Sequence, residues 1–350
     1  GQRQQQQVTV KQQILRLAKN GLIYGVGDGL SRLIGFLLLP VFTAYLTPAD
    51  YGVISILGLL ALIVIPIASF GLSAAAGVCY FEGNRPGRKA ATIWTMFAIL
   101  AVSVSVITLL GILFAGPISA LAFQTTAYGE LVALSLLGTG LSILIIPFGL
   151  YLQFEERAKT FVVLTGASTL VSVGLEIFMV VILNRGVRGV VEAQLIARLA
   201  SFVIFLVLVA PGIQFRISLP VGQELLRLGL PLVPSFGFLF VLQHGNKYLL
   251  QWFDGLEAAG IYTICFNFGL VMLLVVSAFG KAWMPYFMSF INKQDDAPSL
   301  FSHIMTYYVL GMGSLSLLFY AVAKPVVMIL TQPAFHEAYL IVGLSASAQF

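Results

Sequence analysis

Ionisable side chains inside long apolar stretches are the residues of this chain that could do chemistry. On membrane-insertion scales a buried charge costs about 2.5–3.5 kcal/mol, so each one needs a partner or a function. Asp28 and Arg32 are four residues apart and share one face of a helix. They predict a cationic group that lines a cavity, with Asp28 tuning it or exchanging a proton. The alternative is a self-compensating ion pair that fixes helix packing.

Two further polar groups interrupt apolar stretches. Glu176 and Arg198 lie on consecutive antiparallel helices, at similar distances from the turn between them, which predicts a structural ion pair. The segment Gln243-His-Gly-Asn-Lys247 is the most polar one within any apolar stretch. We expect Lys247 to line a cavity, although its place near a helix end also allows it to reach the membrane surface. Lys281 is expected to anchor the inner end of its stretch.

The composition indicates which elements must position these residues. The chain has 350 residues, of which 59% are apolar and 9% charged, and its mean hydropathy is +0.97. Soluble domains are about 45–50% apolar and about 25% charged, so a soluble chain of this composition would expose large apolar patches. The values exclude a soluble enzyme, a disulfide scaffold and a nucleic-acid binder, and they predict an all-α polytopic membrane protein.

Apolar runs of about 20 residues give nine complete spans. They are Leu22–Leu46, Val53–Ala76, Ala91–Ala115, Leu131–Leu152, Phe161–Leu183, Val191–Ala210, Leu225–Phe253, Ala258–Gly280 and His303–Val322. A tenth run begins near Glu337, so we expect the natural chain to continue beyond it. Pro231 and Pro234 predict a kink near the inner end of the seventh span.

Loop charges predict the orientation. With the amino terminus inside, three basic residues fall in outside loops, Arg185, Arg188 and Lys324, and twelve fall in inside loops. The twelve are Arg3, Lys11, Arg16, Lys19, Arg85, Arg88, Lys89, Arg157, Lys159, Arg216, Arg227 and Lys293. This asymmetry is typical of a multi-pass protein whose amino terminus is cytoplasmic. Residues 1–20 form a glutamine-rich segment, which we interpret as a cytosolic tail.

The chain also contains a sparse internal repeat. Pro48–Ile56 aligns with Leu256–Ile264 at an offset of 208 residues, and Phe123–Glu130 aligns with Leu330–Glu337 at nearly the same offset. The offset covers six helices, so the two copies have the same orientation in the membrane. We therefore expect a six-helix bundle over residues 21–212 and a second, incomplete bundle over 213–350, around a central cavity. We expect at least twelve helices in the natural chain.

The repeated turns themselves look structural. Thr47-Pro-Ala-Asp50 places a capping threonine, a proline at the first helical position and an acid at the third, and Asp254-Gly-Leu-Glu257 is a similar helix start. We assign neither turn a role in transport.

Several short motifs carry a family resemblance that covers nearly the whole chain after residue 14. They are Leu46-Thr-Pro-Ala-Asp-Tyr-Gly52, Phe70-Gly-Leu-Ser73, Tyr80-Phe-Glu82, Gln153-Phe-Glu-Glu-Arg-Ala-Lys159, Leu228-Gly-Leu-Pro-Leu-Val-Pro234 and Lys281-Ala-Trp-Met-Pro-Tyr-Phe287. The chain thus resembles the Wzx-type polysaccharide exporters, in the superfamily that includes multidrug extrusion proteins and the lipid II flippase. Many relatives carry Asp-Arg where this chain has Asn246 and Lys247, so the cation is retained and the acid is lost.

The resemblance implies a flippase of the bacterial inner membrane that moves a polyprenyl-pyrophosphate-linked oligosaccharide outward by alternating access. It implies no enzymatic activity. Basic side chains are the natural counter-charge for a pyrophosphate at membrane depth. We predict that Arg32 and Lys247 bind it, with Arg198, His244 and Asn246 in support. Asp28 and Glu176 are candidates for coupling to a proton or Na⁺ gradient, and no cofactor or metal site is expected. Membrane lipids and a glycan polymerase are the expected partners, and no nucleic acid is.

Other functions remain open at this stage. A multidrug exporter of the same fold would be expected to have an acidic cavity, whereas four basic and two acidic residues lie in or at the ends of these spans. A lipid II flippase is not distinguished by sequence. A membrane glycosyltransferase or polymerase would carry acidic catalytic residues and large outside loops, and a non-transporting scaffold would leave the buried charges without a purpose.

Overall fold

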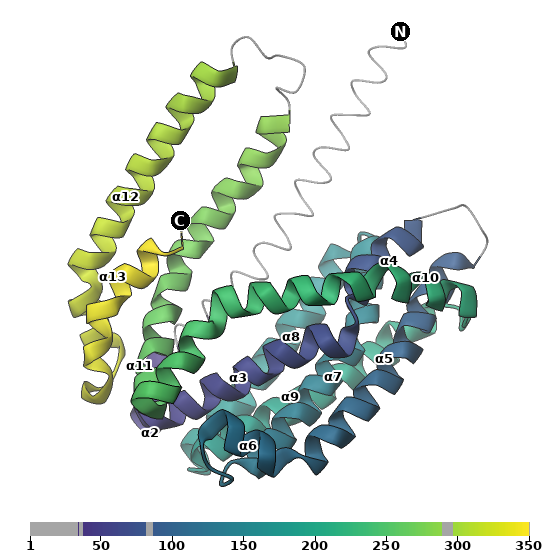
Figure 1. The fold of residues 1–350 in the computed structure, drawn as a ribbon, viewed down its shortest axis with the longest axis horizontal. Helices are drawn as coiled ribbons and strands as arrows, with labels where there is room; N and C mark the ends of the chain where they lie inside the picture. Colours follow the sequence, from purple (N-terminus) through teal and green to yellow (C-terminus); the bar gives the residue numbers. More distant parts are fainter. Residues whose placement is uncertain (1–33, 35–37, 82–86, 289–296, 350) are drawn as a thin grey trace. The chain divides into compact units, whose positions relative to one another are not determined.

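The fold is helical throughout the described residues. The computed structural model describes residues 34, 38–81, 87–288 and 297–349, and every regular element within them is a helix (Figure 1). Seven helical stretches in this part of the chain are long and apolar enough to span a membrane. The predicted all-α polytopic membrane fold is confirmed. Most of the first predicted span lies outside the described residues, and its end is α2 (Leu39–Tyr45).

Most of the other predicted spans correspond to one helix each. The second is divided into α3 (Pro48–Ser69) and α4 (Leu72–Phe81), and the rest agree closely in position. These are α5 (Arg88–Leu113), α7 (Gly129–Phe154), α8 (Ala158–Ile177) with the π-turn η1 (Phe178–Ile182), α9 (Gly186–Leu208), followed by the 3₁₀ turn η2 (Ala210–Gly212), and α12 (Ala297–Leu330). The tenth run begins as η4 (Pro333–Ala338) and α13 (Tyr339–Ser347).

The seventh predicted span begins in the last turn of α10 (Leu219–Gly229), and the rest of it forms, with the eighth, α11 (Val233–Met288), whose helix is interrupted at Gly255. The backbone there has φ 88° and ψ −178°, a conformation open to glycine and strained for other residues. The interruption falls in the predicted turn Asp254–Glu257. The predicted kink near Pro231 is also confirmed, because the 3₁₀ turn η3 (Leu230–Leu232) separates α11 from the preceding helix.

Two short helices were not predicted as separate elements, although the last turn of α10 lies within the seventh predicted span. α6 (Ala115–Phe123) occupies a predicted outside loop and packs against the neighbouring helix α7. It also receives a hydrogen bond from α11, where Tyr248 Oη donates to Leu121 O at 2.8 Å. α10 (Leu219–Gly229) precedes η3 and packs against α4 and α5 through Val221, Gly222 and Leu225. Both are too short or too polar to register as spans, so span counting misses them.

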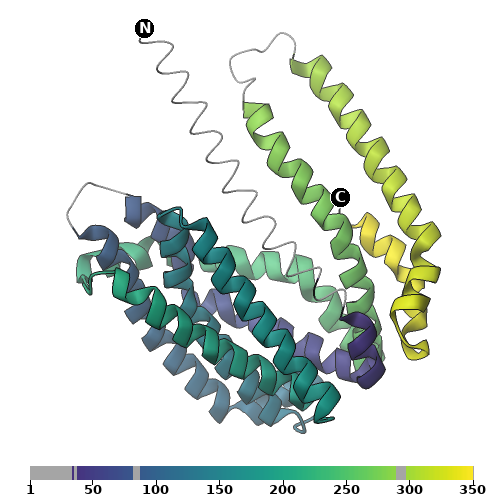
Figure 2. The ribbon, with the colours of Figure 1, turned by 180° about the vertical axis from the view of Figure 1, so that it is seen from behind.

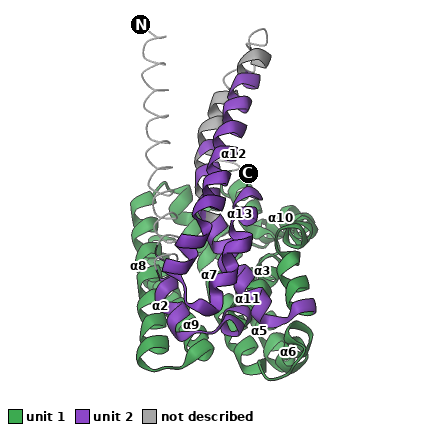
Figure 3. Ribbon diagram, turned by 90° about the vertical axis from the view of Figure 1, so that its left-hand side faces the viewer, with its two compact units in different colours: residues 1–33, 53–252 green, residues 34–52, 253–350 purple. Residues whose placement is uncertain are grey.

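The described residues fall into two compact units (Figure 3). Residues 53–252 belong to unit 1, and residues 34–52 with 253–349 belong to unit 2. The seventh span up to Trp252 thus packs with the helices before it. The predicted bundles, divided between residues 212 and 213, follow the sequence repeat, and that division remains a prediction.

Unit 1 is built on four long helices, α5, α7, α8 and α9, which lie side by side in both views (Figures 1 and 2). Large side chains that are almost fully buried fill the spaces between them and α4, including Tyr80, Leu100, Phe148 and Phe205. Each buried aromatic ring removes about 150–250 Å² of surface from its surroundings. This packing gives the candidate site a fixed frame.

Two helix breaks meet within unit 1. The break between α3 and α4 has positive φ values at Phe70 (50°) and Gly71 (64°), and the break after α10 begins at Gly229. A Cβ on Gly71 would lie 2.5 Å from the carbonyl oxygen of Gly229, and a Cβ on Gly229 would overlap the carbonyl oxygen of Phe70. The two backbones therefore touch directly, and only glycine fits at either position.

A second backbone contact, in unit 2, is reciprocal. A Cβ on Gly52 would overlap the carbonyl oxygen of Leu256, and a Cβ on Gly260 would overlap that of Pro48. In the sequence repeat, Gly260 is the equivalent of Gly52 and Leu256 is the equivalent of Pro48. The start of α3 and the part of α11 after Gly255 are thus equivalent segments of the two repeats, and they contact each other. Reciprocal contacts are what a two-fold axis produces. The repeat predicted from sequence has a structural counterpart at this point.

The start of α3 is capped as predicted. The backbone N–H and Oγ1 of Thr47 both donate to Oδ2 of Asp50 at 2.8 Å, and the N–H of Asp50 donates to Thr47 Oγ1 at 3.2 Å. This reciprocal pattern satisfies the free donors of the first helical turn.

A polar cluster joins the ends of α4, α5 and α7. Glu155, just after α7, accepts hydrogen bonds from Lys89 Nζ at 2.8 Å and from Tyr80 Oη at 2.7 Å. The bond from Lys89, with that from Tyr80, holds the pKa of Glu155 below its usual 4.5. A lowered pKa stabilises the fold above the unfolded-state pKa, and the contribution is lost as pH falls through the folded-state value.

We therefore expect the thermal unfolding midpoint in detergent to fall as pH drops below about 4.5. Part of this fall should disappear in Glu155→Gln, because glutamine cannot be protonated over that range. Glu156→Gln is the neighbouring comparison. Identical pH profiles for the natural chain and Glu155→Gln would show that this cluster does not contribute.

Candidate functional site

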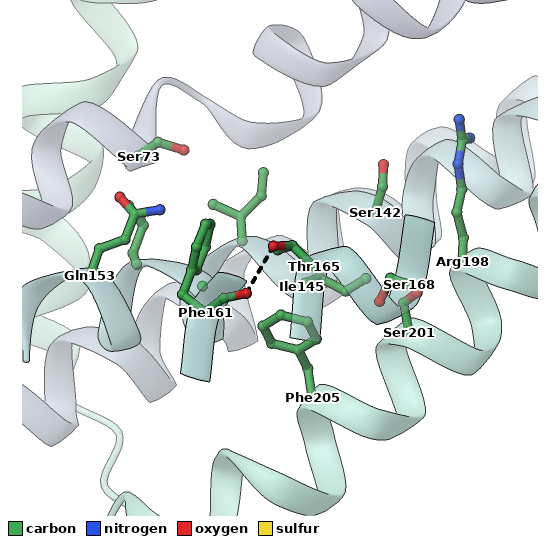
Figure 4. Close-up of a pocket in the computed structure, with 13 residues that line it drawn as sticks. Ser73, Ser142, Ile145, Gln153, Phe161, Thr165, Ser168, Arg198, Ser201 and Phe205 are labelled. Atoms are coloured by element: carbon green, nitrogen blue, oxygen red, sulfur yellow. Dashed lines mark hydrogen bonds between the residues drawn. The ribbon is translucent and has the colours of Figure 1, made fainter. Parts of the chain in front are cut away.

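The candidate site is a cavity of about 460 Å³ inside unit 1. It opens among α4, α7, α8 and α9, and thirteen residues line it (Figure 4). Those with polar side chains are Ser73, Ser142, Gln153, Thr165, Ser168, Arg198 and Ser201. A volume of this size is in the range of small-ligand sites, which are about 300–1,000 Å³.

The hydroxyl groups of the cavity are arranged as acceptors. Thr165 Oγ1 donates to Phe161 O at 2.8 Å, Ser168 Oγ to Leu164 O at 2.8 Å, and Ser201 Oγ to Ala197 O at 2.7 Å. Each proton is thus engaged by the residue's own helix, one turn earlier, while the oxygen keeps lone pairs for another donor. A ligand rich in hydroxyl groups could supply such donors.

Arg198 is the charged residue in this lining. Its guanidinium lies across α7, and a Cβ on Gly138 would be 3.1 Å from Nη1. The absence of a side chain at Gly138 therefore makes room for the cation. The predicted contribution of Arg198 to a binding site is compatible with this position, since its charge lies at the cavity wall with Ser142 and Ser201 (Figure 4).

Glu176 and Arg198 interact electrostatically, but their charged groups do not come within the 4 Å of a direct ion pair. Among the described residues, the ion pairs involve Arg88, Lys89, Arg185 and Arg188, and neither Glu176 nor Arg198 takes part in one. Glu176 instead accepts a hydrogen bond from Ser172 Oγ, one turn away on α8, at 3.1 Å. Equal depth, which follows from the spacing, does not ensure that two side chains point toward each other.

A second polar face runs along α11 before Gly255. His244, Lys247 and Gln251 are spaced three and four residues apart and so lie on one side of the helix. Lys247 is 9% exposed and Gln251 is 3% exposed. Lys247 is therefore buried among neighbouring side chains. Asn246 is exposed, and its Oδ1 accepts the N–H of Lys247 at 2.9 Å.

Two atoms of this face are buried and have no hydrogen-bond partner, Nδ1 of His244 and Oε1 of Gln251. Buried polar atoms are nearly always paired, so such atoms need an explanation. Gln251 was not predicted as a site residue. Its signal is a glutamine one turn from a lysine on the same face of an apolar helix.

Other predicted site residues cannot be placed. Asp28 and Arg32 lie outside the described residues, so the proposed meeting of Arg32 and Lys247 stays a prediction. The lining of the cavity at Arg198 includes no residue of α11. Within the described chain no three His, Cys, Asp or Glu residues lie close enough to hold a metal ion.

Comparison with known proteins places this geometry in a family. Residues 17–291 match the sequence family described as Polysaccharide biosynthesis protein. The chain belongs to this polysaccharide biosynthesis family. The predicted resemblance to polysaccharide exporters is thereby confirmed. No curated protein sequence matches the chain.

Solved structures show the same fold. An inward-facing multidrug resistance MATE family transporter of the MOP superfamily aligns with a TM-score of 0.67 at 13% identity, covering 89% of this chain and 75% of that one. The MATE multidrug transporter DinF-BH gives 0.62 at 16% identity, covering 94% and 82%. The Vibrio cholerae MATE transporter VcmN in its bent form gives 0.54 at 18% identity, covering 95% and 79%.

The residues of the candidate site all fall inside the part of the chain that matches the polysaccharide biosynthesis family. The cavity lining runs from Ser73 to Phe205, and the α11 face ends at Gln251. α12 and α13 lie beyond the match. The fold is that of the aligned transporter structures, and the chain is a multi-pass membrane protein.

Proposed function

We propose that this member of the polysaccharide biosynthesis family flips an oligosaccharide linked to a polyprenyl pyrophosphate across the bacterial inner membrane, from the cytoplasmic to the outer leaflet. The observation that carries the proposal is the cavity of unit 1. It combines hydroxyl acceptors with one guanidinium, between helices that span the membrane. A glycan supplies hydroxyl donors and a pyrophosphate supplies negative charge.

The charge of the cavity favours this substrate over a cationic drug. Among the described residues, its lining contains Arg198 and no carboxylate. In a low-dielectric interior, an unpaired cation repels another cation strongly and attracts a phosphate. Lys247, buried on α11, adds a second positive group within the membrane-spanning part of the chain. A multidrug exporter of the same fold is the second candidate, supported by the solved MATE structures alone.

Several parts of the proposal extend beyond the cavity. Arg32 and Lys247 bind the pyrophosphate, with Arg198, His244 and Asn246 in support. Asp28 or Glu176 couples transport to a proton or Na⁺ gradient, and no other cofactor is needed. The amino terminus is cytoplasmic, and the product is handed to a glycan polymerase.

Replacing Arg198 with glutamine tests the proposal. Losing one charge-assisted hydrogen bond costs about 1.5–3 kcal/mol, so the rate of glycan export should fall about 10- to 100-fold. The measurement is export of lipid-linked glycan by cells that lack their own flippase, with the amount of protein in the membrane determined in parallel. Lys247→Gln should show a similar loss.

Lys159→Gln is the matched control, because it also removes one positive charge but from an exposed position at the start of α8. It should export normally. Full export by both Arg198→Gln and Lys247→Gln would overturn the proposal. The multidrug alternative requires that the natural chain already transports cationic dyes. In that case Arg198→Gln should lose glycan export and gain dye transport.

A further inference from the structure

The side chain of Arg198 lies between two helices that offer its charge different surroundings. Its own helix, α9, packs against both α7 and α8. On the α7 side, the guanidinium lies over Gly138 at the wall of the cavity. On the α8 side, the carboxylate of Glu176 attracts the guanidinium without forming a direct ion pair. The direction of the Arg198 side chain therefore decides whether its charge meets the cavity or Glu176.

The glycine at position 138 makes room for the side chain of Arg198, and the packing of the helix backbones does not require it. A Cβ at this position would lie 3.7 Å from Leu195 Cα on α9, which is an ordinary contact distance between packed atoms. The same Cβ would lie only 3.1 Å from Nη1 and 3.4 Å from Cδ of Arg198. A side chain at position 138 would thus crowd the arginine before it crowds the backbone of α9.

The guanidinium keeps its hydrogen-bond donors available in this position. Among the described residues, Arg198 donates no hydrogen bond, and Glu176 is the charged group with which it interacts. Ser142 and Ser201 line the same cavity, and their hydroxyl groups donate to carbonyl oxygens of their own helices, each at 2.7 Å. A guanidinium has five N–H donors in a fixed plane, which suits an oxyanion with two oxygens on one side. An anionic group in the cavity would accept these hydrogen bonds.

We propose that Gly138 is a positioning residue of the transport cavity. Because position 138 has no side chain, Arg198 extends over α7 and presents its guanidinium to the anionic group of the substrate. A larger residue at this position would turn Arg198 toward Glu176, and the resulting ion pair would withdraw the charge from the cavity. The proposal rests on the proposed function for the nature of the anion, and on the packing of α7, α8 and α9 for the direction of the side chain.

The direction of Arg198 can be tested without transport. Phenylglyoxal modifies the arginine side chains that it can reach, and mass spectrometry of peptides from the full chain in detergent gives the rate at each arginine. An ion pair protects a guanidinium, so Gly138→Val should slow the modification of Arg198 about tenfold. Adding Glu176→Gln to Gly138→Val should restore the rate, because glutamine forms no ion pair. Arg227 is exposed on α10 and should react equally in all of these variants.

Glycan export tests what this position means for transport. Gly138→Val should lower export per molecule of protein in the membrane about tenfold. Gly138→Ala should have a smaller effect, because a shift of Arg198 by a few tenths of an ångström relieves a contact at 3.1 Å. Adding Gly138→Val to Arg198→Gln should cause no further loss, because the shorter glutamine has no guanidinium to displace.

Gly111→Ala is the matched control for crowding within unit 1. Its Cβ would lie 2.5 Å from Leu136 Cδ1, between α5 and α7, and would not contact Arg198. Export per molecule and the modification of Arg198 should both stay at the level of the natural chain.

Two results would overturn the proposal. One is an unchanged rate of modification of Arg198 in Gly138→Val. The other is an equal fold-loss of export when Gly138→Val is added to the natural chain and to Arg198→Gln, because a general packing defect would act in both. Full export by Arg198→Gln and Lys247→Gln would instead overturn the proposed function, and the modification rates would still decide whether Gly138 positions the guanidinium.

Discussion

Alanine at position 52 or at position 260 is expected to destabilise the folded protein by about 3 kcal/mol. Each added methyl group would overlap a backbone carbonyl oxygen, that of Leu256 in one case and that of Pro48 in the other. A backbone oxygen on a helix cannot rotate away, so the two helix starts must separate. Separation also weakens the surrounding contacts, including the edge-on pair of Tyr51 and Phe335 at 5.3 Å.

The reciprocal geometry makes the double variant informative. One separation of the helices accommodates both methyl groups, so Gly52→Ala with Gly260→Ala should cost clearly less than the sum of the single changes. Thermal unfolding in detergent measures all three. Gly58→Ala on the same helix is the control, because no atom lies within 4 Å of its Cβ position. Alanine there should be neutral or stabilising by up to about 1 kcal/mol. Equal effects at 52 and 58 would contradict the contact.

The second large effect is expected at the break between α3 and α4. Gly71→Ala combines two costs, because φ is +64° and the Cβ would lie 2.5 Å from the oxygen of Gly229. Left-handed backbone costs a non-glycine residue about 1–2 kcal/mol, and overpacking costs about 1–3 kcal/mol more. We expect a total of about 3 kcal/mol in the same unfolding measurement.

Two controls separate these costs. Gly186 has a φ of +54° and open space around its Cβ position, so Gly186→Ala should show the backbone cost alone. Gly229 has an ordinary helical φ of −82°, so Gly229→Ala should show the collision alone. If Gly71→Ala costs no more than Gly186→Ala, the two helix breaks do not touch in the membrane.

Hydropathy predicted most of the fold. The predicted spans 131–152 and 191–210 agree with α7 and α9. An apolar run of membrane length can adopt few structures other than a membrane-spanning helix. The kink at Pro231 and the cap at Thr47 were also predicted correctly, since both signals are local. α6 and α10 were missed as separate helices because they are stabilised by packing against long helices. A hydropathy average over a short stretch of sequence does not detect such packing.

The site was harder to predict for the same reason. Arg198 stood out as a charge in an apolar helix, but the hydroxyl lining did not, because Ser73, Ser168 and Ser201 are unremarkable on separate helices and meet only in the fold. Glu176 and Arg198 interact electrostatically but form no direct ion pair, because spacing along two helices fixes depth and leaves rotation free. Rotation is set by packing, as at Gly138, where the guanidinium crosses α7.

The reciprocal contact at Gly52 and Gly260 also bears on how such a chain arises. A half-length polypeptide with this helix start could make the same contact with a second copy of itself, so gene duplication and fusion would require no new kind of interface. The two starts now read Pro48-Ala-Asp-Tyr-Gly52 and Leu256-Glu-Ala-Ala-Gly260. Of these five positions, only the glycine is identical in the two segments. It is also the position at which an added methyl group would force the two helix starts apart.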